Sequence, residues 1–291
     1  MSLLGVILAL VALLAWGFGD FFIQRSARAL GVWESLFAIC LFGAVVLAPF
    51  ILPSLMALEL TGLIILLVLS VVLTFAALFD FSALKDGKLA VVEPLLGLEL
   101  PLTVALGAIF IGENLDLIQL LLILVIFIGI VLAVTVHHHY LFYHRRLLER
   151  GVILAGLGAV TMALANFLTG LGSRETSPLL VIWFTNVFIT LVCLVYLGVN
   201  HRFRPMFHEL KKKYRVVLAQ CVFDNLAWIA FAAAMVLIPI GVATAISESY
   251  IVLTVILGIF VNREKLKTHQ VWGSVVAAGG VVVLAALTAL R

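Results

Sequence analysis

The chain reads LTVALG at residues 102–107 and, 151 positions later, LTVILG at residues 253–258. The same offset relates further identical residues: Glu113 with Glu264, Gln119 with Gln270, and Gly129 with Gly280. Membrane proteins built from two related halves commonly place a transport site between the halves, near the middle of the bilayer. The internal repeat therefore favours movement of a solute across a membrane, without naming the solute.

Composition places the chain in a membrane. Of its 291 residues, 65% are hydrophobic and 11% are charged, and the mean hydropathy is +1.28, well above the range of soluble domains. Apolar stretches of about 20 residues are long enough to cross the hydrocarbon as helices. We predict an all-α integral membrane protein with ten transmembrane helices, at 4–22, 32–53, 61–84, 88–111, 117–136, 151–172, 177–198, 214–237, 239–261 and 269–289. The predicted domains are a first five-helix repeat at 1–136, a connector at 137–150 and a second five-helix repeat at 151–291.

The basic residues predict the orientation of these helices. All but two of the 18 Lys and Arg residues lie in the odd-numbered connections between spans, and the exceptions are Arg174 and Arg291. Basic loops stay on the cytoplasmic side, so we expect a multi-pass protein of the cell membrane with cytoplasmic odd-numbered loops and both termini outside. Each half has an odd number of spans and the opposite charge bias, which predicts an inverted repeat.

Short motifs recur at the ends and centres of these spans. They are Trp16-Gly17, Glu93-Pro94 with Pro101, Gly112-Glu113-Asn114-Leu115, and Arg263-Glu264-Lys265-Leu266 with Gln270, Gly273 and Gly280. With the repeat and the number of helices, these motifs resemble the EamA-type transporters of the drug/metabolite transporter (DMT) superfamily. The resemblance implies a secondary transporter of small organic solutes, a group whose substrates differ widely. The second half lacks a Glu-Pro pair, so substrate contacts need not be symmetric.

Charged residue types well inside the predicted spans are all acidic, and such residues are costly in hydrocarbon and usually functional. A carboxyl group at this depth is either protonated or faces water or a cation. Proton coupling, or a cationic or zwitterionic substrate, therefore fits better than an anionic substrate. The plain alternative is a protonated carboxyl group that bonds a backbone carbonyl and does nothing else. The residues predicted to bind substrate or couple protons are Glu99, Glu248, Asp224, Glu93, Asn166, Asn225, Trp228 and Tyr250.

Three further residues, Asp20, Asp80 and Trp16, are predicted to have gate or structural roles. An alternative function starts from the same aspartates. Residues 17–20 read GFGD, which is similar to the GxGD motif of intramembrane aspartyl proteases, and Asp80 would then be the partner aspartate. Two carboxyl groups sharing a proton would suit that chemistry. The repeat has no explanation in this alternative, so the transporter is the preferred prediction and no enzyme activity is expected.

The remaining expectations concern loops and partners. Glu113 and Glu264 are predicted to order helix ends, and Pro205 to break the chain within the basic seventh connection. We expect no cofactor and no metal, because the histidines at 137–139 and His144 fit an interfacial belt better than a metal site. The expected partners are a small-molecule substrate, the lipid bilayer and, with coupling, protons. No nucleic acid is expected, and a homodimer is compatible with the sequence.

Overall fold

The computed structural model describes residues 2–86, 95–134, 150–253 and 267–290, and these residues form helices and turns without strands. The first half of the chain contains α1 (Ser2–Leu30), α2 (Val32–Met56), α3 (Leu60–Asp86), α5 (Glu99–Phe110) and α6 (Leu117–Val134). The second half contains α7 (Arg150–Glu175), α8 (Pro178–Val199), α9 (Phe203–Leu237), α10 (Ile240–Ser247) and α12 (Thr268–Ala289). The predicted all-α class is confirmed for the described residues.

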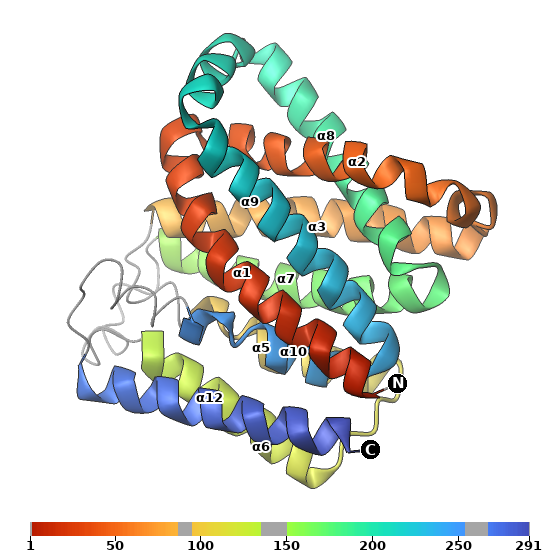
Figure 1. Cartoon of the computed structure of the whole chain (residues 1–291), viewed down its shortest axis with the longest axis vertical. Coiled ribbons are helices and arrows are strands. Elements are labelled where there is room, and N and C mark those ends of the chain that lie inside the picture. The colour runs from red at the N-terminus through yellow and green to blue at the C-terminus, as the bar shows by residue number, and fades with distance from the viewer. Residues whose placement is uncertain (1, 87–94, 135–149, 254–266, 291) are drawn as a thin grey trace.

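Seven of the described helices are long and apolar enough to cross a bilayer. Three shorter apolar helices, Glu99–Phe110, Leu117–Ala133 and Ile240–Leu253, occupy the remaining predicted spans. The predicted spans 88–111 and 239–261 lie partly outside the described residues, so the total of ten crossings stays a prediction. Both termini lie at the same end of the bundle (Figure 1), as an even number of crossings requires. We call this the terminal end, and the opposite end, where α1 meets α2 and α8 meets α9, the basic end.

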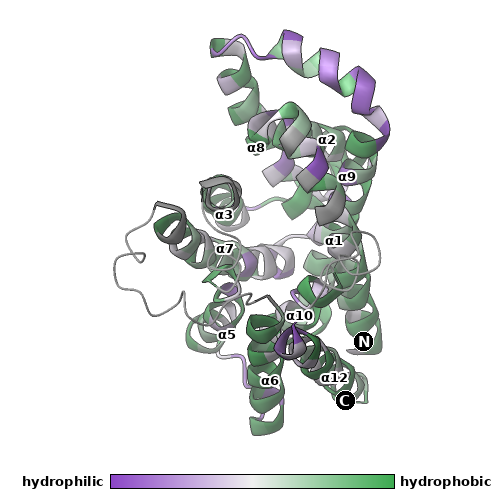
Figure 2. Cartoon of the chain, turned by 90° about the vertical axis from the view of Figure 1, so that its left-hand side faces the viewer, coloured by the Kyte–Doolittle hydropathy of each residue, from purple (hydrophilic) through white to green (hydrophobic). Residues whose placement is uncertain are grey.

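One sequence expectation is wrong. Pro205 was expected to break the chain, but α9 begins at Phe203 and contains it. Proline is tolerated in the first helical turn, where its missing N–H has no partner to lose. The break comes later, at Lys213, whose backbone is non-helical (φ −114°, ψ 19°). Figure 2 shows the hydrophilic character of the opening segment of α9, whereas the long helices are mostly hydrophobic.

The helices pack in pairs that reveal the relation between the halves. Helix α1 packs along α9 and α3 along α7, so the first helix of each half meets the third helix of the other. Equivalent helices also contact each other: α2 packs extensively along α8 and α6 along α12, and α5 meets α10 over a smaller area. Along the equivalent helices α1 and α7 the colours in Figure 1 progress toward opposite ends of the bundle. This is the pattern that a two-fold axis between two oppositely directed copies produces.

The contact between α6 and α12 repeats itself residue by residue. A Cβ atom on Gly129 would lie 2.6 Å from the backbone nitrogen of Ala277, and a Cβ atom on Gly280 would lie 2.8 Å from Ile126. Gly129 and Gly280 are related by the 151-residue offset, and so are Ile126 and Ala277. Small residues let membrane helices approach closely, and this approach drives their association where lipid supplies no hydrophobic force.

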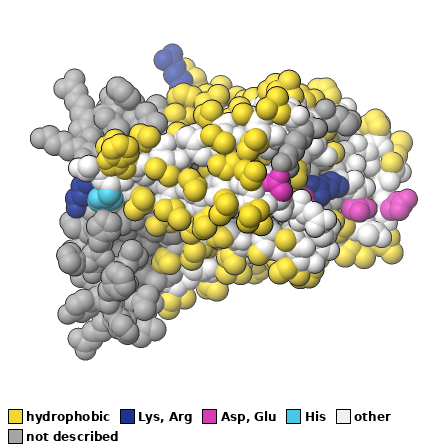
Figure 3. Space-filling view, turned by 90° about the horizontal axis from the view of Figure 1, so that it is seen from below, with side chains coloured by type: hydrophobic (Ala, Val, Ile, Leu, Met, Phe, Trp, Pro, Cys, Tyr) yellow, Lys and Arg dark blue, Asp and Glu magenta, His cyan; other side chains and the backbone are white. Residues whose placement is uncertain are grey.

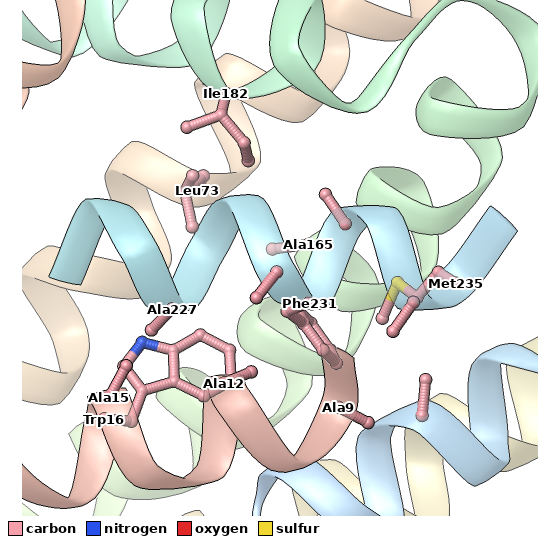
Figure 4. Close-up of a cluster of buried hydrophobic side chains, with 14 of the residues drawn as sticks. Ala9, Ala12, Ala15, Trp16, Leu73, Ala165, Ile182, Ala227, Phe231 and Met235 are labelled. Atoms are coloured by element: carbon pink, nitrogen blue, oxygen red, sulfur yellow. The ribbon is translucent and has the colours of Figure 1, made fainter. Parts of the chain in front are cut away.

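Small residues also allow close helix packing in the core, at the contact between α1 and α9. Ala9, Ala12 and Ala15 of α1 are buried, and they bring the helix close to Ala227 and its neighbours on α9. Figure 4 shows these alanines with Trp16 and Phe231 between the two ribbons. Large apolar side chains such as Val45, Leu60 and Val282 are instead exposed on the outside. Figure 3 shows one such face, with a band of hydrophobic and uncharged side chains between charged ones.

The glycine contact yields a direct stability test. Replacing Gly129 with alanine forces the α12 backbone to move, so Gly129→Ala is expected to destabilise the protein by about 1–3 kcal/mol, as overpacking does. Gly279→Ala is the matched control, because a Cβ atom there meets nothing within 4 Å. Alanine is expected to leave stability unchanged or to raise it by up to about 1 kcal/mol at that exposed helical site. Thermal unfolding in detergent measures both, and equal melting temperatures would refute the close contact.

Candidate functional site

The fourth helix of each half is interrupted at equivalent positions. Gly97 and Leu98 form a turn just before α5, and Glu248 and Ser249 form a turn just after α10. The two turns are separated by the 151-residue offset of the repeat. Their hydrogen bonds also correspond, since the Leu100 N–H donates to the Gly97 carbonyl at 3.4 Å and the Ile251 N–H to the Glu248 carbonyl at 3.3 Å. Interrupted helices inside a bundle are typical of transporter binding sites.

Two carboxyl groups meet where these helices contact each other. Glu99 is the first residue of α5, Glu248 directly follows α10, and a side-chain hydrogen bond joins them. Glu248 is only 6% exposed. An ionised carboxylate is an acceptor only, so a hydrogen bond between two carboxyl groups requires a proton on one of them. The structure thus brings together two of the predicted residues, one from each half, in an arrangement suited to holding one proton.

Aromatic side chains cluster around Trp16, and one member of this cluster follows Glu248 closely in the sequence. The rings of Trp16 and Trp228 meet edge to face at 5.2 Å, and Trp16 is 5.9 Å from Tyr250, two residues after Glu248. Phe231 completes the cluster at 5.1 Å from Trp16. Three residues predicted from the sequence for different roles thus form one cluster, which joins α1, α9 and residues 250–253. Such ring faces attract cations, by about 0.5–2 kcal/mol each.

Asn225 lies in a structural link between helices. Its side-chain oxygen accepts a hydrogen bond from Asn186 at 2.9 Å, and its amide nitrogen donates to the carbonyls of Ile39 at 3.1 Å and Cys221 at 2.9 Å. These bonds join α2, α8 and α9, and a Cβ atom on Gly43 would overlap both amides. Sequence reasoning missed Asn186, although an amide in the middle of an apolar span was a usable signal.

Two other predicted residues lie on α7 and α9, and the first of them has an unused polar atom. Asn166 on α7 is 1% exposed, and its amide nitrogen has no hydrogen-bond partner in the part of the chain that the structure describes. A buried amide without a partner costs about 1–3 kcal/mol, so this group suits a bound ligand or water. Asp224 lies on α9 opposite Gly19 of α1, half-buried and without an ion pair among the described residues. Glu93 lies outside the described residues.

The protease alternative is not supported. Asp80 on α3 lies against Gly158 of α7. Asp20 belongs to α1, which packs mainly along α9. The two aspartates therefore belong to different helix pairs, whereas an aspartyl protease requires them to share a proton.

At the terminal end, an ion pair joins the two halves. The guanidinium group of Arg174 on α7 donates to Glu113 at 2.7 Å and to the carbonyls of Met235 and Ile238 at 2.8 and 3.3 Å. The Ile240 N–H donates to the same carboxylate at 2.8 Å, so Glu113 also caps α10, where the helix dipole favours a negative charge. This agrees with the predicted helix-ordering role of Glu113; Glu264 lies outside the described residues.

At the basic end, a second ion pair joins the halves. Glu34 lies in the first turn of α2 and is buried, and the Arg202 guanidinium, between α8 and α9, donates to it at 2.7 Å. This hydrogen bond and the carboxylate charge raise the pKa of Arg202 further above its usual value, since both favour the charged form. Gly31 precedes the helix with φ +114°, which glycine adopts without strain. Sequence reasoning missed this pair.

These features define a multi-pass membrane protein built from two copies of one helical unit. The sequence matches the EamA-like transporter family over residues 3–135 and 149–286. The chain therefore belongs to that family, within the DMT superfamily.

A solved structure titled "Crystal structure of protein" matches this fold with a TM-score of 0.70, over 99% of each chain at 15% identity. A comparison with curated proteins finds no match.

The terminal-end ion pair gives the second prediction. Glu113→Ala leaves the Arg174 guanidinium and the first N–H groups of α10 without their acceptor, at a cost of about 1–3 kcal/mol for each such group left buried. Glu209→Ala is the control, because it removes a more exposed ion pair, the one with Lys212 at 2.9 Å, which is worth about 0–1 kcal/mol. Unfolding temperatures in detergent should fall clearly for the first variant and little for the second. A matching fall in both would show that Glu113 does not clamp the two halves.

Proposed function

We propose that this protein is a secondary transporter that carries a small organic solute across the cell membrane by alternating access. The observation that carries the proposal is the Glu99–Glu248 hydrogen bond between the interrupted fourth helices of the two halves. Sites of this kind lie at the interface of repeats, where rocking of one half against the other exposes them to each side in turn. The proposed orientation places the basic end in the cytoplasm, as its Lys and Arg residues favour.

The chemistry of the interior supports a cationic or zwitterionic substrate such as an amine or an amino acid. The sequence places Asp and Glu, but no Lys or Arg, well inside the predicted spans. The carboxyl pair would supply a negative charge, and the faces of Trp16, Trp228 and Tyr250 would surround the cation. Phosphorylated substrates would instead need a buried basic residue.

The carboxyl pair also supports proton coupling. When a substrate cation separates Glu99 from Glu248, the shared proton loses one of its two acceptors and the charged form gains a partner. Release of the proton would then accompany substrate binding, and rebinding would accompany substrate release. The coupling direction in this scheme is antiport of protons against the substrate.

The two ion pairs support the alternating motion. Each joins a glutamate of the first half to an arginine of the second half, Glu113 to Arg174 at the terminal end and Glu34 to Arg202 at the basic end. A rocking motion that opens one end would separate the ion pair there, while the ion pair at the other end stays formed. Ion pairs suit this opening and closing, because a partly solvated ion pair contributes little net energy and separating it therefore costs little.

The test uses purified protein in liposomes with an imposed pH gradient and a panel of amines, amino acids and quaternary cations. Glu99→Gln and Glu248→Gln should each reduce proton-driven flux by about 10- to 100-fold, the equivalent of one hydrogen bond to a charged group. Glu209→Gln, which neutralises an exposed carboxylate outside the bundle, should transport normally. Wild-type flux in both site variants would remove the carboxyl pair from the mechanism, and a panel without any transported compound would contradict the substrate class.

A further inference from the structure

The opening segment of α9, Phe203–Lys212, is a surface helix held by its apolar side. Met206 is buried, and the ring of Phe203 meets Phe37 of α2 at 5.9 Å. Its other side is strongly basic: Arg204, Lys211 and Lys212 are all exposed. Its one acidic residue, Glu209, already bonds Lys212 at 2.9 Å. The segment therefore carries a surplus of positive charge at the basic end of the bundle.

A hollow lies beside this segment, where the backbone of α9 bends at Lys213. It has a volume of about 490 Å³ and lies between the last turns of α1 and the bend of α9. Its lining residues are Arg25, Ala29, Lys213 and Val216. Two of the four are cations and none is acidic, so the hollow is electrostatically complementary to an anion.

Apolar surface continues from the hollow toward the middle of the bundle. On α9, Phe223 follows Val216 of the hollow by seven residues, so the two share one face of the helix. On α1, Phe18 is 41% exposed and packs with Phe223 at 6.0 Å. Phe18 and Arg25 are seven residues apart and so share one face of α1. The cationic hollow thus continues into an apolar wall, which we define as Phe18 and Phe223.

We propose that the hollow binds the phosphate headgroup of an anionic phospholipid whose acyl chains lie against the apolar wall. A soluble phosphate would use the cations and leave the wall uncovered, whereas a lipid satisfies both at once. Basic clusters beside membrane helices bind anionic headgroups in this manner. The site lies between α1 of the first half and α9 of the second, so the lipid would bridge the two halves. The proposal does not depend on the transported substrate.

The test is a lipid titration followed by native mass spectrometry of the full-length protein in detergent. Phosphatidylglycerol should bind more tightly than phosphatidylcholine with the same acyl chains. The double variant Arg25→Gln, Lys213→Gln should weaken phosphatidylglycerol binding by about 30-fold, from about 5-fold for each cation near the headgroups. The matched control is Arg204→Gln, Lys211→Gln, which removes the same charge from the same region without touching the hollow. Lys213→Arg should restore binding, and all four side chains are exposed, so the variants should fold.

Three results would overturn the proposal. One is equal loss of phosphatidylglycerol binding in both double variants, which would mean a diffuse charge effect. Another is equal binding of the two lipids by the wild type. The third is full displacement of the lipid by glycerol phosphate at millimolar concentration, which would make the hollow a site for soluble phosphates.

Discussion

A charged group without a partner is very costly in the hydrocarbon of a bilayer, and this constraint organises the whole molecule. Arg174 and Arg202 lie at the two ends of the bundle, bonded to Glu113 and Glu34. In the interior, the side chains of Glu99 and Glu248 are joined by a hydrogen bond, so each carboxyl group has a partner in the low-dielectric region. Backbone groups follow the same rule, since the two interrupted helices still close their turns with short-range hydrogen bonds.

The repeat explains where these groups meet. In a two-fold arrangement, equivalent helices contact each other at the axis, and here these are α2 with α8, α5 with α10, and α6 with α12. A polar residue on the contacting side of either fourth helix thus faces the other half. The two largest other contacts, α1 with α9 and α3 with α7, also join one half to the other. Motion of one half relative to the other therefore changes all of the largest helix–helix interfaces together.

The all-α membrane class, the internal repeat and several residues of the candidate site were predicted from the sequence. Each of these depends on local composition or on the 151-residue offset. Glu99, Glu248, Trp16 and Tyr250 stood out as rare residue types in apolar spans, and the structure joins Glu99 with Glu248 and Trp16 with Tyr250. The ion pairs were harder, since Arg202 and Glu34 are 168 positions apart and nothing local indicates their meeting. Pro205 misled because proline breaks a helix only beyond the first turn. Arg174 offered an unused signal, as one of two basic residues on the side predicted to lie outside.

The side chains at equivalent positions of the two fourth helices differ, and this difference matters for ligand recognition. By the 151-residue offset Glu99 corresponds to Tyr250, and Glu248 corresponds to Gly97. The backbone is nearly symmetric about the axis, but the chemical groups on its two sides are unlike. A molecule lying across the axis would meet different neighbours at its two ends, so its two opposite placements would differ in energy. Chirality and head-to-tail polarity in a ligand can thereby be distinguished by a scaffold that is itself close to symmetric.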